Sequence, residues 1–323
     1  MNEGLVYIGK IIDLQPIQGA DFIVSATVIC GRGGKWKGIV KKEDFSIGEK
    51  CIVFLPDSQL NEVNHSHLSF MKDSNWRVKM RRFRGTPSEV LIIPEKEMHS
   101  NLEIGDDVTE LNYVTKYHKP IPPHLNGLAK GLFPDFIPKT DELNYQRHPE
   151  LVDNLVGKPY YITEKADGSS TTAFKYKGEF GVCSRNLELQ RNEENGYWKV
   201  ALKYQLEEKL PEGYALQWET VGNSIQGNPM GIKDIDGLAF SAYKIDEYRY
   251  LNYFEFHSLC IELDFPTCTQ ISIGNNFSKD GLETLGEGKY KNGKQREGVV
   301  VRSQFNEGHA PISFKVINLG YEK

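Results

Sequence analysis

The sequence predicts an α+β protein of two domains, an all-β module followed by a mixed domain of strands and helices. Three observations lead to this fold class. Short runs rich in Val, Ile and Phe, separated by turn residues, fill residues 1–115. Strand-like and helix-like stretches alternate over residues 139–323. Between them, residues 116–138 are dense in proline and glycine, which is typical of a linker.

Composition excludes several classes of protein. The chain of 323 residues is 39% hydrophobic and 26% charged, as expected of a globular protein, and it contains no stretch typical of a membrane span or secretory signal. Its five cysteines are scattered without a CxxC pair, which argues against a disulfide framework or a zinc site. We therefore expect a monomer in the reducing cytoplasm, with no membrane partner. Because the net charge is −5, any affinity for nucleic acid must come from a local basic surface.

The first 115 residues contain five predicted strands. They are Tyr7–Leu14, Phe22–Ile29, Lys35–Val40, Lys50–Phe54 and Glu89–Ile93. Glycines 31–34 lack the GxxxxGK[ST] order of a phosphate loop and precede a strand, so they predict a hairpin turn. Five short strands at this spacing favour a partly closed barrel, and the arrangement resembles the OB fold of nucleic-acid-binding modules.

A basic stretch, Asn75–Gly85, is the informative part of this module. In a strand, the alternation of its cations with Val78 and Met80 would place positive charge on one face. The aromatic residues Trp76 and Phe83 interleave with the cations, as in surfaces that track phosphates and stack bases. The alternative is a charged, solvated edge strand. We predict contact with nucleic acid or polyphosphate through Arg77, Lys79, Arg81, Arg82 and Arg84.

The second domain has two predicted amphipathic helices and several strands. The helices are Tyr197–Leu210 and Tyr250–Leu263. The strands are Ala215–Thr220, Leu238–Ile245, Gly298–Arg302 and Ile312–Val316.

Lys165 is the residue around which this domain is organised. Residues 160–163 are aromatic or β-branched, and Asp167-Gly168 is a turn dipeptide, so Lys165 is predicted at the end of a strand. A strand end can present a side chain to a cleft, although a surface lysine before a turn is the simpler interpretation.

Six short stretches, in order, support a chemical role. They are Glu164–Ser170, Ser184–Asn186, Leu216–Gly222, Phe240–Ile245, Glu297–Arg302 and Ser313–Asn318. Together they resemble the collinear motifs of the covalent nucleotidyltransferases, which include ATP-dependent RNA and DNA ligases and mRNA capping enzymes. The resemblance covers residues 139–323. It implies a nucleotidyltransferase fold, an ATP-grasp-like ligase adenylylation domain of antiparallel sheets and helices.

The resemblance implies roles for the charged residues. Lys165 would attack the α-phosphate of ATP, which requires a deprotonated amine, and neighbouring cations and a divalent metal can lower its pKa. Asp167, Glu219 and Glu297 would hold Mg²⁺ or Mn²⁺ through waters, or contact the ribose. Lys315 would contact the α-phosphate. Many RNA ligases have a second lysine at the position of Ile317.

Further roles concern nucleotide recognition. Glu164 would accept a hydrogen bond from the adenine amine, and Tyr243 would stack on the purine, with Phe240 as the fallback. Arg185 would clamp phosphate or the reacting ends, because its planar guanidinium suits that task. Gly168, in the turn after Lys165, belongs to the same nucleotide-binding set.

The order of the two domains indicates which branch of the covalent nucleotidyltransferases the chain resembles. DNA ligases and capping enzymes carry their OB domain after the last motif, whereas here the OB-like module comes first. This order resembles the RNA ligases with an N-terminal OB domain that seal nicks bearing a 3′-OH RNA end. We therefore expect an ATP-dependent RNA ligase acting on RNA or an RNA-containing nicked duplex. The alternatives are a DNA ligase or guanylyltransferase, or a catalytically silent nucleic-acid-binding protein.

Overall fold

A computed structural model describes residues 4–95, 101–117 and 127–322. The chain forms two compact units. The first comprises Met1–Pro120 and Gln146–Glu150, and the second comprises Ile121–Tyr145 and Leu151–Lys323. Part of the predicted linker, residues 118–126, lies outside the described residues. No helix within the described ranges is long and apolar enough to cross a membrane.

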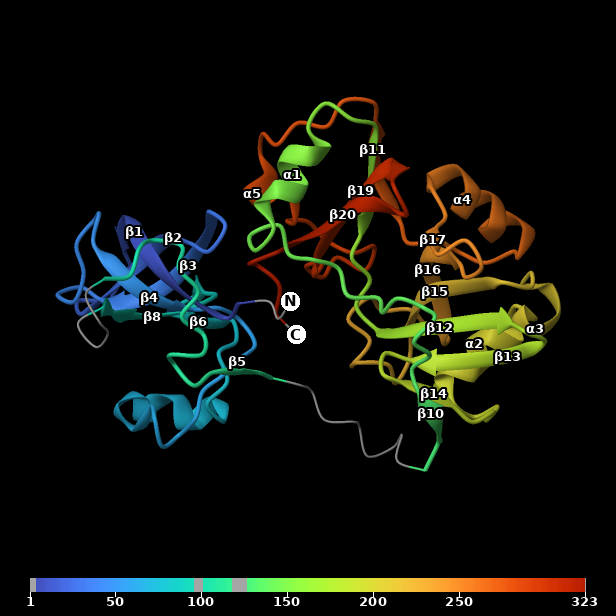
Figure 1. Ribbon diagram of the computed structural model, residues 1–323, viewed down its shortest axis with the longest axis horizontal. Helices are drawn as coiled ribbons and strands as arrows, with labels where there is room; N and C mark the ends of the chain where they lie inside the picture. The colour runs from blue at the N-terminus through green and yellow to red at the C-terminus, as the bar shows by residue number, and fades with distance from the viewer. Residues whose placement is uncertain (1–3, 96–100, 118–126, 323) are drawn as a thin grey trace. The chain divides into compact units, whose positions relative to one another are not determined.

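The first unit is an OB-fold barrel, as expected from the sequence. Its strands are β1 (Val6–Pro16), β2 (Ile23–Cys30), β3 (Gly34–Lys41), β4 (Lys50–Phe54) and β8 (Leu91–Pro94). They pair in the order β3-β2-β1-β4-β8, every pair antiparallel (Figure 1). A parallel bridge between Gly38 and Val90 joins β3 to the residue just before β8, which closes the barrel.

Smaller elements flank the barrel. They are β5 (Ser58–Gln59), the 3₁₀ helix η1 (Ser66–Ser74), β6 (Arg81–Phe83), β7 (Thr86–Ser88) and β9 (Thr115–Lys116). Alternate residues of the strands pack into two separate clusters: Val28, Cys51 and Val53 belong to one, and Ile8, Ile52 and Phe54 belong to the other. Strand β4 is therefore buried on both faces, whereas β2 alternates between buried and partly buried residues.

The short segment Gln146–Glu150 returns to the barrel. Gln146 Nε2 donates to the carbonyl of Lys35 at 2.8 Å and to the buried carboxylate of Glu89 at 3.1 Å. A Cβ at Gly34 would lie 1.5 Å from the Gln146 carbonyl oxygen, so only glycine fits there. The sequence pattern placed this segment in the second domain, because these contacts join residues far apart in the chain.

The second unit contains two antiparallel sheets. The first has seven strands, in the order β10 (Ala129–Leu132), β14 (Leu187–Leu189), β13 (Glu179–Ser184), β12 (Ser169–Tyr176), β15 (Tyr214–Val221), β16 (Asp236–Lys244) and β17 (Arg249–Tyr250). The second has four strands, in the order β18 (Gln270–Gly274), β11 (Tyr160–Glu164), β19 (Gly298–Glu307) and β20 (Ala310–Ile317). Strand β10 lies within the stretch that the sequence indicates as linker.

Helices pack against both sheets (Figure 1). They are α1 (Pro149–Leu155), α2 (Gly196–Lys203), α3 (Leu206–Lys209), α4 (Tyr253–Glu262) and α5 (Leu282–Leu285). Helices α2, α3 and α4 share a core with Leu216 and Trp218 of the seven-stranded sheet. Helices α1 and α5 share a core with Ile162 and Val299 of the four-stranded sheet. The helix predicted at Tyr197–Leu210 is broken at Gln205, whose φ of 54° is left-handed.

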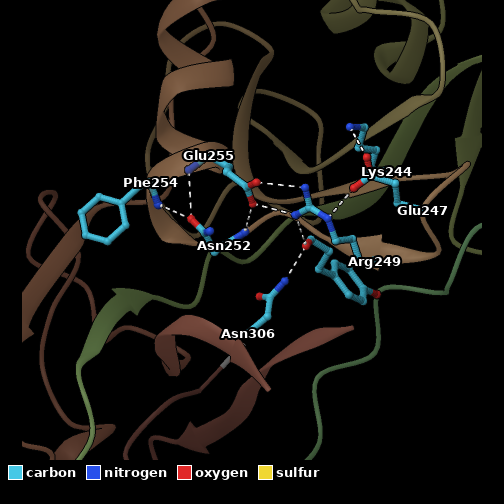
Figure 2. A network of polar contacts seen from close by, with 8 residues as sticks. Lys244, Glu247, Arg249, Asn252, Phe254, Glu255 and Asn306 are labelled. Carbon is cyan, nitrogen blue, oxygen red and sulfur yellow. Dashed lines mark hydrogen bonds and ion pairs between the residues drawn. The ribbon is translucent and has the colours of Figure 1, made fainter. Parts of the chain in front are cut away.

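An ion-pair network joins α4 to β17 (Figure 2). The Arg249 guanidinium donates two hydrogen bonds to Glu255, at 2.7 and 2.9 Å, and one to Glu247 at 2.6 Å. Asn252 and Glu255 form a capping box at the start of α4. Asn306 of β19 donates to the carbonyl of Tyr250, so the network also connects the two sheets.

Polar residues lie on the sheet faces that point away from these two cores, although α4 also packs against Tyr161 on one of them. Because successive side chains of a strand point to opposite faces, Gln217 and Glu219 lie opposite the core residues Leu216 and Trp218. By the same alternation, residues 161, 163 and 165 face away from the Ile162 core. These faces supply the candidate site.

Candidate active site

Lys165 directly follows β11, at the strand end that the sequence predicts. Its backbone is held on both sides, because its N–H donates to the Gly298 carbonyl at 3.0 Å and its carbonyl accepts from the Tyr290 hydroxyl at 2.7 Å. The Tyr290 hydroxyl also accepts from the N–H of Glu297 at 3.1 Å. The Lys165 Nζ donates to Glu297 Oε2 at 2.7 Å. One tyrosine thus sets the positions of both partners of this ion pair.

Two more carboxylates face Lys165. Glu219 of β15 accepts a hydrogen bond from the N–H of Gly168 at 3.1 Å. A Cβ at Gly168 would lie 2.2 Å from the Thr220 carbonyl oxygen, so glycine allows the turn to pack against β15. Asp167 is buried and accepts a hydrogen bond from the hydroxyl of Tyr321.

The charges around Lys165 and Glu219 shift the pKa values of both residues. Burial by itself lowers the pKa of Lys165, but Glu297, Glu219 and Asp167 outweigh it and raise that pKa above its usual value. Burial raises the pKa of Glu219 to about 7, although Lys165 acts in the opposite direction. Lys165 is therefore a charged ammonium here, whereas we expected neighbouring cations to lower its pKa.

Lys315 of β20 belongs to the same cluster. Burial, and then repulsion by Lys165, lower the pKa of Lys315 below its usual value. Its N–H donates to the carbonyl of Leu143 at 2.8 Å, and its carbonyl accepts from Tyr145, so residues 143–145 extend the edge of the sheet.

The charges of the cluster suit a divalent cation. The carboxylates of Asp167, Glu219 and Glu297 surround the ammonium group of Lys165, and Glu297 also acts on Lys315. No group of three His, Cys, Asp or Glu side chains in the described part of the chain is arranged to hold a metal directly. The three oxygen donors fit Mg²⁺ or Mn²⁺ bound through waters, because a second cation offsets their excess negative charge.

Arg185 and Glu164 lie at the ends of strands from different sheets. Arg185 follows β13 and forms an ion pair with Asp141, and both side chains are mostly exposed. Glu164 is the last residue of β11, and its N–H donates to Thr269 at 2.8 Å.

The two aromatic candidates lie in different places. Tyr243 is 7% exposed and belongs to a core with Phe174 and Ala215. Phe240 packs against a small core that contains Ala166, the residue after Lys165. The structure therefore brings the fallback residue, Phe240, to the site.

The basic stretch is only partly a strand. Arg81 and Arg82 begin β6, but residues 75–80 form no strand, and Trp76 is buried in the cluster that contains Ile8 and Phe54. Arg77 is paired within its own unit, with Asp57 at 2.6 Å and with the Tyr117 ring at 3.8 Å. Arg82 donates to the Gly85 carbonyl at 3.1 Å.

The remaining two cations of the stretch are exposed. Lys79 and Arg84 both present their side chains to solvent.

The sequence patterns did not identify several residues of the site. Tyr290 and Tyr321 hold Lys165 and Asp167, yet both come from loops without a motif. Glu142 pairs with the buried Arg302 of β19. Arg302 ends the stretch Glu297–Arg302. A charged residue in an otherwise apolar strand could have indicated that it needs a buried partner.

Comparisons with known proteins agree with this geometry. An RNA ligase family model matches residues 158–317, and an OB-fold domain model matches residues 5–95. A comparison with curated protein sequences found no match.

Solved structures give matches over nearly the whole chain. An RNA ligase variant from Naegleria gruberi with AMP and manganese is 31% identical, covering 97% of this chain and 96% of that one, with a TM-score of 0.80. The same ligase with pyrophosphate is 31% identical, covering 98% and 97%, with a TM-score of 0.78. A variant with ATP and manganese is 30% identical, covering 97% of both chains, with a TM-score of 0.79. Identity at this level over the full length shows that the chain belongs to the RNA ligase family.

Proposed function

We propose that this protein is an ATP-dependent RNA ligase that joins a 3′-OH RNA end to a 5′-phosphate end, at nicks in duplexes. The observation that carries the proposal is Lys165 at the end of β11, hydrogen-bonded to Glu297 at 2.7 Å and close to Lys315. A nucleophilic lysine, a second cation for the phosphate and three carboxylates for a metal are what covalent nucleotidyl transfer requires.

In the first step, Lys165 Nζ forms a bond to the α-phosphorus of ATP. The bond from that phosphorus to the bridging oxygen breaks, and pyrophosphate leaves. The ammonium must first give up a proton, which we assign to Glu297 Oε2 because it accepts a hydrogen bond from Nζ. Lys315 and Arg185 contact the phosphates.

Two further steps complete sealing. An oxygen of the RNA 5′-phosphate attacks the phosphorus of lysine–AMP, the Nζ–P bond breaks, and the adenylylated end forms. The RNA 3′-OH then attacks the 5′-phosphate, and AMP leaves. The barrel contacts the duplex through the exposed cations of residues 79–84.

A divalent cation completes the proposed site. Asp167, Glu219 and Glu297 hold Mg²⁺ or Mn²⁺ through waters. When bound, the cation neutralises charge on the triphosphate.

Intact-mass measurement tests the proposal. Incubation with ATP and magnesium should add one AMP to the protein, and Lys165→Ala should remove this adduct. Glu219→Ala and Glu297→Ala should each sharply reduce it while the fold stays intact. An adduct on Lys165→Ala would contradict the assignment of the nucleophile.

Nucleotide and strand preference separate the proposal from its relatives. If Glu164 accepts from the adenine amine, ATP should be used and GTP poorly, because a mismatched partner leaves the carboxylate unpaired. Equal adducts from both nucleotides would remove Glu164 from the site. Sealing of nicks with a 3′-OH RNA end, but not an all-DNA end, would distinguish an RNA ligase from a DNA ligase.

A further inference from the structure

Residues 288–296 form a short hairpin just before β19. Its two sides are joined by an antiparallel bridge between residues 289 and 295, and the Tyr290 N–H donates to the Lys294 carbonyl at 2.8 Å. The Gly293 N–H donates back to the Tyr290 carbonyl at 2.9 Å, and the φ of Gly293 is 84°. A left-handed glycine at this position closes the tip as a tight turn.

Three side chains hold the hairpin in place. Tyr290 is 3% exposed, and its hydroxyl makes the two hydrogen bonds at the nucleophile described above. Asn292 donates to the carbonyl of Pro229 at 2.9 Å, and Arg296 donates to three carbonyls of residues 285–287. The hairpin is therefore a fixed element beside the nucleophile, so a ligand that binds it loses little affinity to ordering its backbone.

The remaining cations of the hairpin are three exposed lysines. Lys289 precedes the inward-pointing Tyr290 and so points the other way, and Lys291 and Lys294 lie at the turn. Among the described residues, none of the three ammonium groups has a hydrogen-bond or ion-pair partner. Residues 288–296 contain no acid, although the whole chain has a net charge of −5. The hairpin thus presents uncompensated positive charge to solvent.

The pattern of charge fits a phosphate backbone. Lysine ammonium groups bind phosphate oxygens as point charges, and three of them around an exposed turn suit a row of phosphates better than one compact anion. Because Tyr290 hydrogen-bonds to Lys165, an RNA end that reaches Lys165 brings its neighbouring phosphates to this hairpin. An RNA strand is therefore the partner that the position and the charge both favour.

We propose that Lys289, Lys291 and Lys294 bind the sugar–phosphate backbone of the RNA substrate beside the nucleophile. This inference rests on the proposed function. It places a nucleic-acid surface on the second unit in addition to the one proposed on the barrel. Contacts of this kind fix the position of the strand and read no base sequence.

Binding of the full chain to a fluorescent nicked duplex with a 3′-OH RNA end tests the inference. Anisotropy gives the binding constant K at a series of salt concentrations. The hairpin variant replaces all three of its lysines by Gln. The matched control replaces three exposed lysines at and near α2 and α3 by Gln and so removes the same charge, at Lys177, Lys199 and Lys209.

The hairpin variant should bind the nicked duplex more weakly than the wild type. Its slope of log K against log salt should be shallower by about 0.9 for each lost contact, about 2.7 in all, whereas the control keeps the wild-type slope. A variant with Arg at the three hairpin positions should also keep that slope, because it keeps the charge. Adenylylation by ATP alone should run at the wild-type rate in the hairpin variant, since no RNA takes part in that step.

Thermal unfolding checks that the hairpin variant folds. If it does not, Lys291→Gln alone replaces it, with an expected change in slope of about 0.9. A hairpin variant with the slope of the control would overturn the inference. Slower adenylylation with unchanged RNA binding would also overturn it, because the lysines would then serve the triphosphate of ATP.

The same measurements separate this inference from the proposed function. A wild type that gains AMP from ATP, with a hairpin variant that binds RNA like the control, would refute only the role of the hairpin. A wild type that never gains AMP would refute the proposed function itself.

Discussion

Replacing Glu297 by Gln should lower the pKa of Lys165. The two side chains are each only 25% exposed, and their hydrogen bond is 2.7 Å long. A hydrogen bond to a charged group contributes about 1.5–3 kcal/mol. At about 1.4 kcal/mol per pKa unit, its loss lowers the pKa of Lys165 by about one to two units.

Trace acetylation measures this change in the ligand-free protein. At about pH 9, most Lys165 amines carry a proton, so the labelling rate follows the small deprotonated fraction. A fall of one to two pKa units therefore raises the rate at Lys165 by about 10- to 100-fold, read by mass spectrometry of its peptide. Activity should nevertheless fall, because Glu297 also serves the metal in the proposed function.

Glu164→Gln is the matched control. Glu164 is adjacent to Lys165 but is not among the carboxylates that raise its pKa. Labelling of Lys165 should stay at the wild-type rate in this variant. An unchanged rate in Glu297→Gln would refute the argument that the ion pair holds the proton on Lys165.

Three other predictions address the surroundings of the nucleophile. The pKa of Glu219 is raised to about 7, so the folded protein loses stability as the pH rises from about 4.5 to 7. The variant Glu219→Gln should therefore raise the unfolding temperature above that of the wild type more at pH 8 than at pH 5. Equal increases in unfolding temperature at the two pH values would contradict this. Tyr290→Phe should slow adenylylation and cost about 1–3 kcal/mol of folding stability, because the Lys165 carbonyl loses its hydrogen-bond donor. A wild-type adenylylation rate and unfolding midpoint would argue against a role for Tyr290 in positioning Lys165. Replacing Lys79, Arg81 and Arg84 by Ala should weaken binding to a nicked duplex and reduce the slope of log K against log salt by about 0.9 per lost phosphate contact. The control Arg77→Ala should chiefly lower the unfolding temperature, because Arg77 is held by Asp57 and Tyr117. If the triple variant keeps the wild-type slope, the stretch is only a charged edge of the barrel.

Local patterns in the sequence determined most of the secondary structure and the chemical class. The strands of the barrel and Lys165 at the end of β11 follow from residue type and period two, which depend only on neighbours in the chain. The ordered motifs led to the ligase family for the same reason. The spacing of apolar residues did not predict the break of the helix at Gln205. The spacing shows which residues can share a buried face, whereas tertiary packing decides whether a single residue between them adopts a left-handed backbone.

The tertiary structure decided the protonation and the membership of the site. Glu297 and Lys165 are 132 residues apart, and Tyr321 and Asp167 are 154 apart, so no local pattern connects them. The direction of the Lys165 pKa shift is a balance between burial and three carboxylates, and that balance depends on distances that only the fold sets. Likewise, Tyr243 and Phe240 share one strand, but Phe240 lies near Leu238, which pairs with Glu219, whereas Tyr243 pairs with Ala215 farther along β15 and belongs to another core.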